Sequence, residues 1–182
     1  MEILKRNILL TGSVNEEMLF KIGEKILKYN SEDAKNENVF QNYIREPINI
    51  YVNTNGGYVD DGFSIIDIIG MSTTPIVTIC LGKAYSMGLL ILLAGHIRYA
   101  SANACSMMHD VSTGVAGTAQ EIFEYTDIVK GIQDKAFNYI KERCKIPSKL
   151  YIEAKVNKKD IYFNLDDMLK YKIVEFKLDN IL

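Results

Sequence analysis

Residues 75–94 read PIVTICLGKAYSMGLLILLA, and this stretch decides the fold. Residues 75–81 are almost wholly apolar, which is typical of a strand buried on both faces. Residues 82–85 contain a glycine and predict a tight bend, after which a helix is expected from Met87 to Ala94. The sequence thus predicts a buried strand, a sharp turn and a helix, with Ser86 at their junction.

The same alternation of helices and strands continues on both sides. Ser13 and Glu16 have capping-box spacing before a helical pattern over 14–29, and the polar, aperiodic residues 30–46 predict an exposed loop. This alternation predicts an α/β fold with no repeat or linker, so we expect one domain over 1–182. The other expected elements are strands at 7–10, 48–52, 97–100, 104–109, 161–163 and 173–176, and helices at 60–71, 119–143, 148–156 and from 164–167 onward.

Composition excludes several classes of protein. The 182 residues are 48% hydrophobic and 24% charged, which excludes a disordered chain. The formal net charge of −2 predicts no attraction to nucleic acid or acidic membranes, and we interpret the basic run at 155–159 as a solvated face. The longest apolar stretch, residues 89–94, is far shorter than the roughly 20 residues that span a bilayer.

The cysteines and the first residues bear on the compartment. Cys80, Cys105 and Cys144 form no CxxC pair and have no zinc-finger spacing with the histidines, so no metal site is predicted. Residues 1–6 lack the pattern of a signal peptide. We therefore expect reduced thiols in a cytoplasmic protein.

Ser86 is placed where a serine nucleophile could act. A helix N-terminus points backbone N–H groups and the positive end of its dipole toward this position, which suits a reaction that develops an oxyanion. The alternative is a simple N-cap, a role that serine commonly has. Position alone favours the N-cap.

The chain offers two histidines as a base for this serine. His109 ends a predicted strand before a glycine-containing loop, so we prefer it, whereas His96 follows the helix-ending Gly95 and is interpreted as structural. Asp160, between a basic run and an apolar strand, is a candidate for the orienting carboxylate, with a charge at a strand edge as its alternative. Spacing alone is weak evidence for a triad.

Two further features lie near these residues. The pair Gly56-Gly57 lets the backbone approach a ligand closely, although an ordinary turn is favoured when the pair is considered alone. Lys83, three residues before Ser86, raises the alternative of a Ser-Lys dyad, which we rank below the histidine.

In this order, these segments resemble the ClpP family of serine peptidases over most of the chain. Residues 78–88, TICLGKAYSMG, are similar to the family's nucleophile motif, the most specific element. Residues 53–59, NTNGGYV, resemble its glycine-pair segment, and residues 107–109, MMH, its histidine motif. Weaker similarities lie in ILLTG at 8–12, DIYF at 160–163, Asp167, Tyr171 and Val174.

The resemblance implies a role for each candidate residue. Ser86 would be the nucleophile, His109 the general base and Asp160 the residue that orients the imidazole. The backbone N–H groups of Gly57 and Met87 would form the oxyanion hole. No metal or organic cofactor is implied, and any ATP would be used by a separate unfoldase.

The resemblance also implies a fold and an assembly. The fold would be ClpP/crotonase-like, with repeated β-β-α units and a protruding handle helix at 119–143. Homo-oligomers of stacked heptameric rings would enclose the active sites and cleave peptides or unfolded proteins. Apolar residues on more than one face of the handle favour an interface as well as a core, against the alternative of packing within one subunit: Ile122, Phe123, Ile128, Val129, Ile132, Phe137, Tyr139 and Ile140.

Several positions depart from the family pattern. Asn55 stands where proline is usual, and His109 is followed by Asp110 and Val111 where Gln-Pro is usual. The acidic neighbour is expected to affect the protonation of the histidine and the shape of the groove. The bulky Tyr85 stands beside the nucleophile, and Lys172 replaces an expected glycine.

The expected partners and alternatives follow from these comparisons. Few residues precede the first strand, and 30–46 is longer than usual, so docking of a Clp-type ring ATPase is in doubt and a divergent or phage-encoded relative would fit. The sequence favours a serine endopeptidase. The alternatives are a catalytically silent ClpP-like scaffold or regulatory subunit and, ranked lower, a crotonase-type acyl-CoA enzyme, which needs no serine at position 86.

Overall fold

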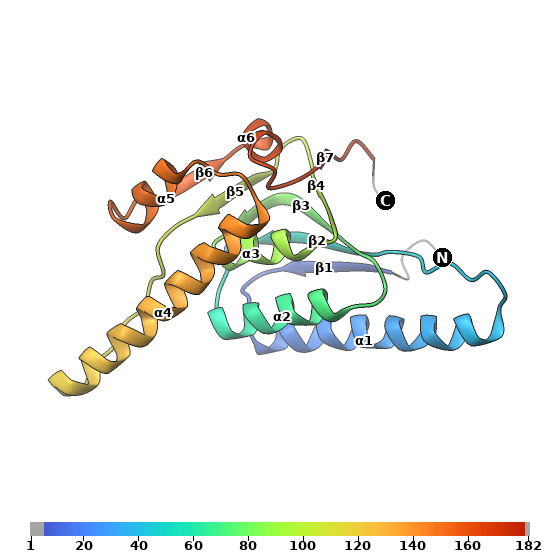
Figure 1. Cartoon of the computed structure of the whole chain (residues 1–182), viewed down its shortest axis with the longest axis horizontal. Coiled ribbons are helices and arrows are strands. Elements are labelled where there is room, and N and C mark those ends of the chain that lie inside the picture. Colours follow the sequence, from blue (N-terminus) through green and yellow to red (C-terminus); the bar gives the residue numbers. More distant parts are fainter. Residues whose placement is uncertain (1–5, 181–182) are drawn as a thin grey trace.

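The computed structural model describes residues 6–180, so the expectations drawn from residues 1–5 lie outside the described part. Thirteen elements follow one another in these residues and alternate between helix and strand over most of the chain (Figure 1). They are β1 (Asn7–Thr11), α1 (Glu16–Val39), β2 (Ile48–Thr54), α2 (Val59–Met71), β3 (Ile76–Tyr85), α3 (Met87–Ala94), β4 (Ile97–Ala100), β5 (Cys105–Met108), α4 (Ala119–Arg143), α5 (Ser148–Lys155), β6 (Ile161–Phe163), α6 (Leu165–Lys170) and β7 (Phe176–Lys177).

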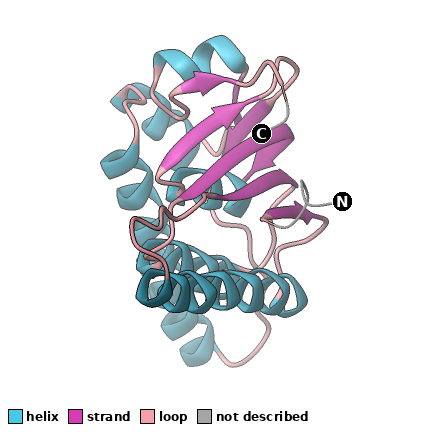
Figure 2. Ribbon diagram, turned by 90° about the vertical axis from the view of Figure 1, so that its right-hand side faces the viewer, coloured by secondary structure: helices cyan, strands magenta, loops and turns pink. Residues whose placement is uncertain are grey.

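The strands form one largely parallel sheet, which confirms the predicted α/β class (Figure 2). Its main order is β1-β2-β3-β4-β7, and β3 is long enough to have two partners on one side. Residues 77–80 of β3 pair with β4, and residues 83–85 pair with β5. β6 then pairs antiparallel with β5. The ends of β3, β5 and β6 therefore lie next to one another, and the candidate site residues lie at these ends.

Helices α1, α2 and α3 lie together on one side of the strands, and α4 extends away from the sheet (Figure 1). Every residue of α3 is buried, as expected for a helix that is apolar on all sides. Within residues 6–180, no helix combines the length and the apolar character needed to cross a bilayer. The bounds predicted for α3 and α4 are confirmed.

The first helix differs from its prediction at both ends. Its N-cap is Asn15, whose side chain accepts a hydrogen bond from the Met18 amide at 3.0 Å, so the predicted capping box at Ser13 is wrong. The helix also continues to Val39, so the predicted loop over 30–46 is reduced to residues 40–47. Asp33, a polar residue in this last part of the helix, is buried by tertiary partners, which hydrophobic periodicity does not detect.

The predicted bend at residues 82–85 is also wrong, because β3 continues to Tyr85. Gly82 has φ +87° within the strand, and the residues after it are held by pairing with β5, a partner distant in sequence. The last strand covers residues 176–177 and not 173–176. Ile173 and Val174 are instead buried in the turn after α6.

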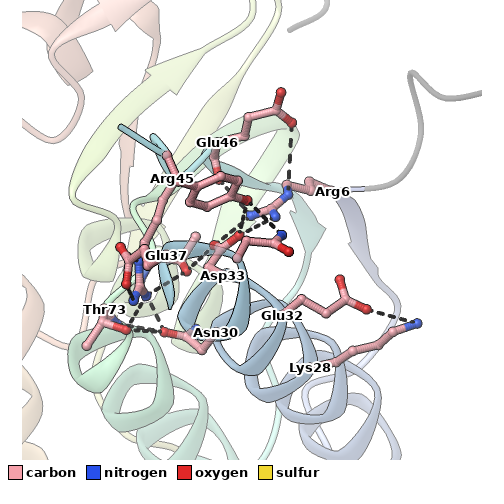
Figure 3. Close-up of polar contacts among 12 residues, drawn as sticks. Arg6, Lys28, Asn30, Glu32, Asp33, Glu37, Arg45, Glu46 and Thr73 are labelled. Carbon is pink, nitrogen blue, oxygen red and sulfur yellow. Dashed lines mark hydrogen bonds and ion pairs between the residues drawn. The ribbon is translucent and has the colours of Figure 1, made fainter. Parts of the chain in front are cut away.

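A buried ion pair fixes the extended end of α1. The carboxylate of Asp33 is fully buried and accepts two hydrogen bonds from the Arg6 guanidinium, at 2.9 and 2.5 Å. Tyr43 and Thr74 donate to the same carboxylate at 2.7 and 2.6 Å. Figure 3 shows Arg6 and Asp33 facing each other at the end of α1. The cluster joins α1, the loop after it, and the residues before β1 and β3.

The ionised form of Asp33 is strongly favoured in the folded protein. Burial opposes ionisation of the carboxyl group, but hydrogen bonds from Arg6, Thr74 and Tyr43 outweigh it and hold the pKa of Asp33 well below its usual range. The folded state therefore binds a proton at Asp33 less readily than the unfolded chain does.

The first prediction concerns the stability contributed by this carboxylate. Asp33→Asn keeps the shape of the side chain but leaves Arg6 without its buried anionic partner, and we expect the free energy of unfolding to fall by roughly 3 kcal/mol. Urea unfolding at one protein concentration measures the change. The matched control is Glu32→Gln. Glu32 also has a basic partner, Lys28, but this ion pair is long, at 3.9 Å, and both side chains are exposed (Figure 3). Equal effects of the two changes would contradict the assignment.

The second prediction is the pH dependence of that contribution. An unfolded Asp has a pKa of about 3.9, so a folded pKa below it adds stability that is complete above that pH and is lost as the pH falls through the folded value. The difference in unfolding free energy between wild type and Asp33→Asn should be constant from about pH 6 to 8 and shrink below about pH 4. A difference that shrinks between pH 8 and 6 would show that another group is responsible.

Candidate active site

Ser86 lies between the end of β3 and the start of α3, as predicted, but it does not cap the helix. Its side chain makes no capping hydrogen bond, and its backbone has φ 54° and ψ −121°. A non-glycine residue with positive φ is strained, and such conformations persist where the surrounding structure enforces them. Here the Ser86 amide donates to the Met107 carbonyl at 2.9 Å, which ties the turn to β5. The hydroxyl is left free to face a side chain.

That side chain is His109. Its Nε2 lies 2.8 Å from the Ser86 hydroxyl oxygen, a normal hydrogen-bond distance. The sheet explains the contact, because Tyr85 and Met107 are partners in the β3–β5 ladder and the next residues of both strands leave on the same edge. The structure therefore brings together the two residues that the sequence analysis singled out first.

Asp160 lies on the other side of the imidazole. Its Oδ1 is 3.7 Å from His109 Nδ1, which is longer than a hydrogen bond, and half of its side chain is exposed. The antiparallel β5–β6 ladder pairs Met108 with Ile161, so the residues just beyond this pair, His109 and Asp160, face each other. The serine, the imidazole and the carboxylate thus lie next to one another in space, at the ends of three neighbouring strands.

The alternatives to this set lie elsewhere. His96 Nδ1 accepts a hydrogen bond from the Ile76 amide at 2.9 Å, which gives it the structural role predicted for it. Lys83 lines a separate polar depression with Gly12, Ser13 and Asn53. All three cysteines are free thiols, and burial raises the pKa of the Cys80 thiol to about 12, which leaves it protonated and a poor nucleophile.

Gly56 packs directly against the serine, and Gly57 packs against Val14. A Cβ at Gly56, where φ is +98°, would lie 2.8 Å from the Ser86 Cβ, and one at Gly57 would lie 2.2 Å from the Val14 carbonyl oxygen. A side chain at Gly56 would therefore displace the turn at Ser86, and one at Gly57 would displace the backbone at Val14. The buried Thr54, which the sequence analysis did not identify, supports the turn by accepting from the Gly56 amide at 3.0 Å.

A cleft of about 250 Å³ opens beside Ser86 and His109. Gly57 and Met87 border it, so both predicted oxyanion-hole residues line the same cleft as the serine. Asn55 and Asp110–Ser112 also border the cleft, and its walls are mostly apolar. The wall residues are Val59, Leu90, Met108, Ala136, Phe137 and Ile140.

Part of this wall comes from α4, which the sequence analysis missed. Phe137 and Ile140 are buried on α4 and line the cleft. Because α4 has apolar residues on more than one face, their helical spacing predicts a core or an interface between subunits. No local signal in the sequence distinguishes a cleft wall from either of these.

Two departures from the family pattern have a structural explanation. The ring of Tyr85 packs edge to face against Tyr162, with 5.7 Å between centroids, and is not among the cleft-lining residues. It therefore does not narrow the cleft. Lys172 has φ 57°, the conformation for which glycine is preferred, at the position where glycine was expected.

Comparisons with known proteins agree with this fold. The family model described as Clp protease matches residues 2–176. A point mutant of ClpP1 from Listeria monocytogenes has the same fold, with a TM-score of 0.81 and 21% identity over 98% of this chain and 94% of that one. This likeness confirms the ClpP-like fold, and the family match covers nearly the whole chain. The chain belongs to the Clp protease family.

Proposed function

We propose that this protein is a serine endopeptidase in which Ser86 is the nucleophile and His109 the general base. The observation that carries the proposal is the 2.8 Å contact between the Ser86 hydroxyl oxygen and His109 Nε2, made by a serine in a strained turn at a helix N-terminus. A hydroxyl is a weak nucleophile until a base accepts its proton, and an imidazole at this distance can do so.

The reaction would proceed in two halves. Ser86 Oγ attacks the scissile carbonyl carbon while His109 Nε2 takes the hydroxyl proton. His109 then returns this proton to the leaving amine, which leaves an ester on Ser86. Water, deprotonated by the same imidazole, cleaves that ester and restores the serine. Over the whole cycle His109 returns each proton that it accepts, and no metal or organic cofactor takes part.

The backbone N–H groups of Gly57 and Met87 would bind the oxyanion. Met87 is the first residue of α3, and an N–H at that position has no acceptor within its own helix. The positive end of the α3 dipole would add to the stabilisation. Both residues border the cleft beside Ser86, which supports this assignment.

Asp160 would orient the imidazole. A carboxylate beside Nδ1 keeps the proton on that nitrogen, so that Nε2 is free to accept from the serine. The 3.7 Å distance means that the carboxylate and the ring must approach each other for a direct hydrogen bond to form. Catalytic hydrogen bonds that are long in a free enzyme often shorten when substrate binds.

The substrate would be a peptide or an unfolded protein. The apolar walls of the cleft suit an apolar side chain next to the scissile bond. A crotonase-type acyl-CoA enzyme would need no Ser-His contact, and that contact therefore supports the peptidase.

The assembly would be a homo-oligomer of stacked heptameric rings around the active sites. Phe123 and Ile128 on α4 are 68% and 60% exposed, which supports α4 as the handle at an interface between subunits. Any ATP would be used by a separate ring ATPase that delivers unfolded chains.

We also propose a single peptidase domain over residues 1–182 and, given the three free thiols, a location in the cytoplasm.

The third prediction tests the pair that carries the proposal. Ser86→Ala and His109→Ala should each lower the rate of hydrolysis of a fluorogenic peptide by on the order of 10⁶, and the double variant should be no worse, because the two residues act as a unit. His96→Asn is the control and should keep its activity, since the His96 side chain accepts a hydrogen bond from the backbone of β3 and does not line the cleft. Activity that survives Ser86→Ala would contradict the proposal. An assembled wild-type protein without hydrolysis would favour the silent scaffold.

The fourth prediction concerns the close approach at the glycine pair. Gly56→Ala should lower kcat/KM by roughly 100-fold, because its Cβ would push Ser86 away from its position beside His109. Gly70→Ala is the matched control, since a Cβ there meets nothing within 4 Å. Thermal unfolding of both variants separates loss of activity from loss of fold. Unchanged activity in Gly56→Ala would show that the glycine pair does not position the serine.

A further inference from the structure

An ion pair joins the two segments that carry His109 and Asp160. The ammonium of Lys158 donates to Oδ2 of Asp110. Asp110 directly follows His109, and Lys158 precedes Asp160 by two residues in the turn between α5 and β6. The acidic neighbour of the histidine and one lysine of the basic run at 155–159 are therefore partners.

The pair is partly shielded on the side of the carboxylate. The side chain of Asp110 is 21% exposed, and its Oδ1 is buried without a hydrogen-bond partner among the described residues. The Lys158 contact on Oδ2 thus compensates a carboxylate that is largely withdrawn from water. Removing the ammonium would leave this charge uncompensated in the residue that follows His109.

The position of Asp160 depends on the turn that carries it. Lys158 has φ 55°, in the left-handed region. On the α5 side, the Lys159 amide donates to the Glu153 carbonyl at 3.1 Å and fixes the turn to its own helix. Toward β5, Lys158 supplies the side-chain link between this turn and the His109 segment.

The other lysines of the basic run have different partners. Lys155 pairs with Asp134 on α4. Lys159 pairs with Glu153 on α5, at 2.5 Å. Neither partner is in the His109 segment. The link to that segment is therefore specific to Lys158 within the run, and Lys159 provides a matched control of the same charge, one residue away.

We infer that the Asp110–Lys158 ion pair is a positioning device for the imidazole and its carboxylate. It holds the segment after His109 against the turn that carries Asp160, and so keeps Asp160 close enough to the ring to approach it. The inference rests on the proposed function, because it assigns the pair an effect on the catalytic step. Asp110 and Lys158 act through His109 and Asp160 and do not themselves react.

The fifth prediction is a double-mutant cycle on the assembled protein with a fluorogenic peptide substrate. Lys158→Met and Asp110→Asn should each lower kcat by about ten-fold with little change in KM, since misplacing a catalytic group slows the chemical step. The double variant should be no slower than either single one, because the pair is lost in each. Lys158→Arg should retain most of the activity, and Lys159→Met should match wild type.

Salt provides a second measurement, and its first part uses the wild-type protein alone. Screening by about 1 M NaCl weakens partly exposed ion pairs, so kcat of the wild type should fall relative to about 0.1 M NaCl. The kcat of Lys158→Met should then change much less, with assembly checked at both salt concentrations. If the ion pair had a merely structural role, Lys158→Met would instead change the melting temperature, and salt would change kcat equally in the wild type and the variant.

Each other outcome has a distinct meaning. Unchanged kcat in Lys158→Met and Asp110→Asn, multiplied losses in the double variant, or equal loss in Lys159→Met would overturn the positioning role while leaving the peptidase intact. A wild-type protein whose hydrolysis does not depend on Ser86 would overturn the proposed function, and the positioning role with it.

Discussion

The candidate site depends on the backbone pairing of β3 with β5. This short parallel ladder ends at Tyr85 and Met107, and it is continued by the Ser86 amide, which donates to the Met107 carbonyl. Ser86 and His109 are 23 residues apart in sequence, yet this pairing sets their side chains at hydrogen-bond distance. The antiparallel β5–β6 ladder then places Asp160 by the same logic. Hydrogen bonds between backbones thus determine the arrangement of the three side chains.

The turn at Ser86 is strained, and its surroundings hold it in place. Behind it lies α3, whose eight residues are all buried, so the helix cannot shift without opening the core. In front of it lies Gly56, which approaches so closely that no side chain would fit. Rigid packing on both sides suits a site that must hold a serine and backbone donors in a fixed geometry before substrate arrives.

The sequence analysis correctly predicted the helices whose bounds depend on residues close in sequence. The apolar run of α3 fixes its bounds within the sequence itself, and α4 begins at a local capping box, Thr118 and Glu121, that the sequence analysis did not identify. The end of α1 could not be predicted in this way, because Asp33 is polar yet buried by partners from distant segments. β3 likewise passes through Gly82 because β5 pairs beyond it. The contribution of α4 to the cleft and the partner of Lys158 are tertiary contacts, and no spacing rule reveals them.

The central claim is that Ser86 is a nucleophile activated by His109. The most direct measurement is intact-mass analysis of the purified, assembled protein after treatment with a fluorophosphonate, followed by peptide mapping. The account predicts one adduct per chain, located on Ser86 in the wild-type protein and absent from His109→Ala. No adduct on the wild type, or an adduct on Ser86 that forms equally fast without His109, would contradict it.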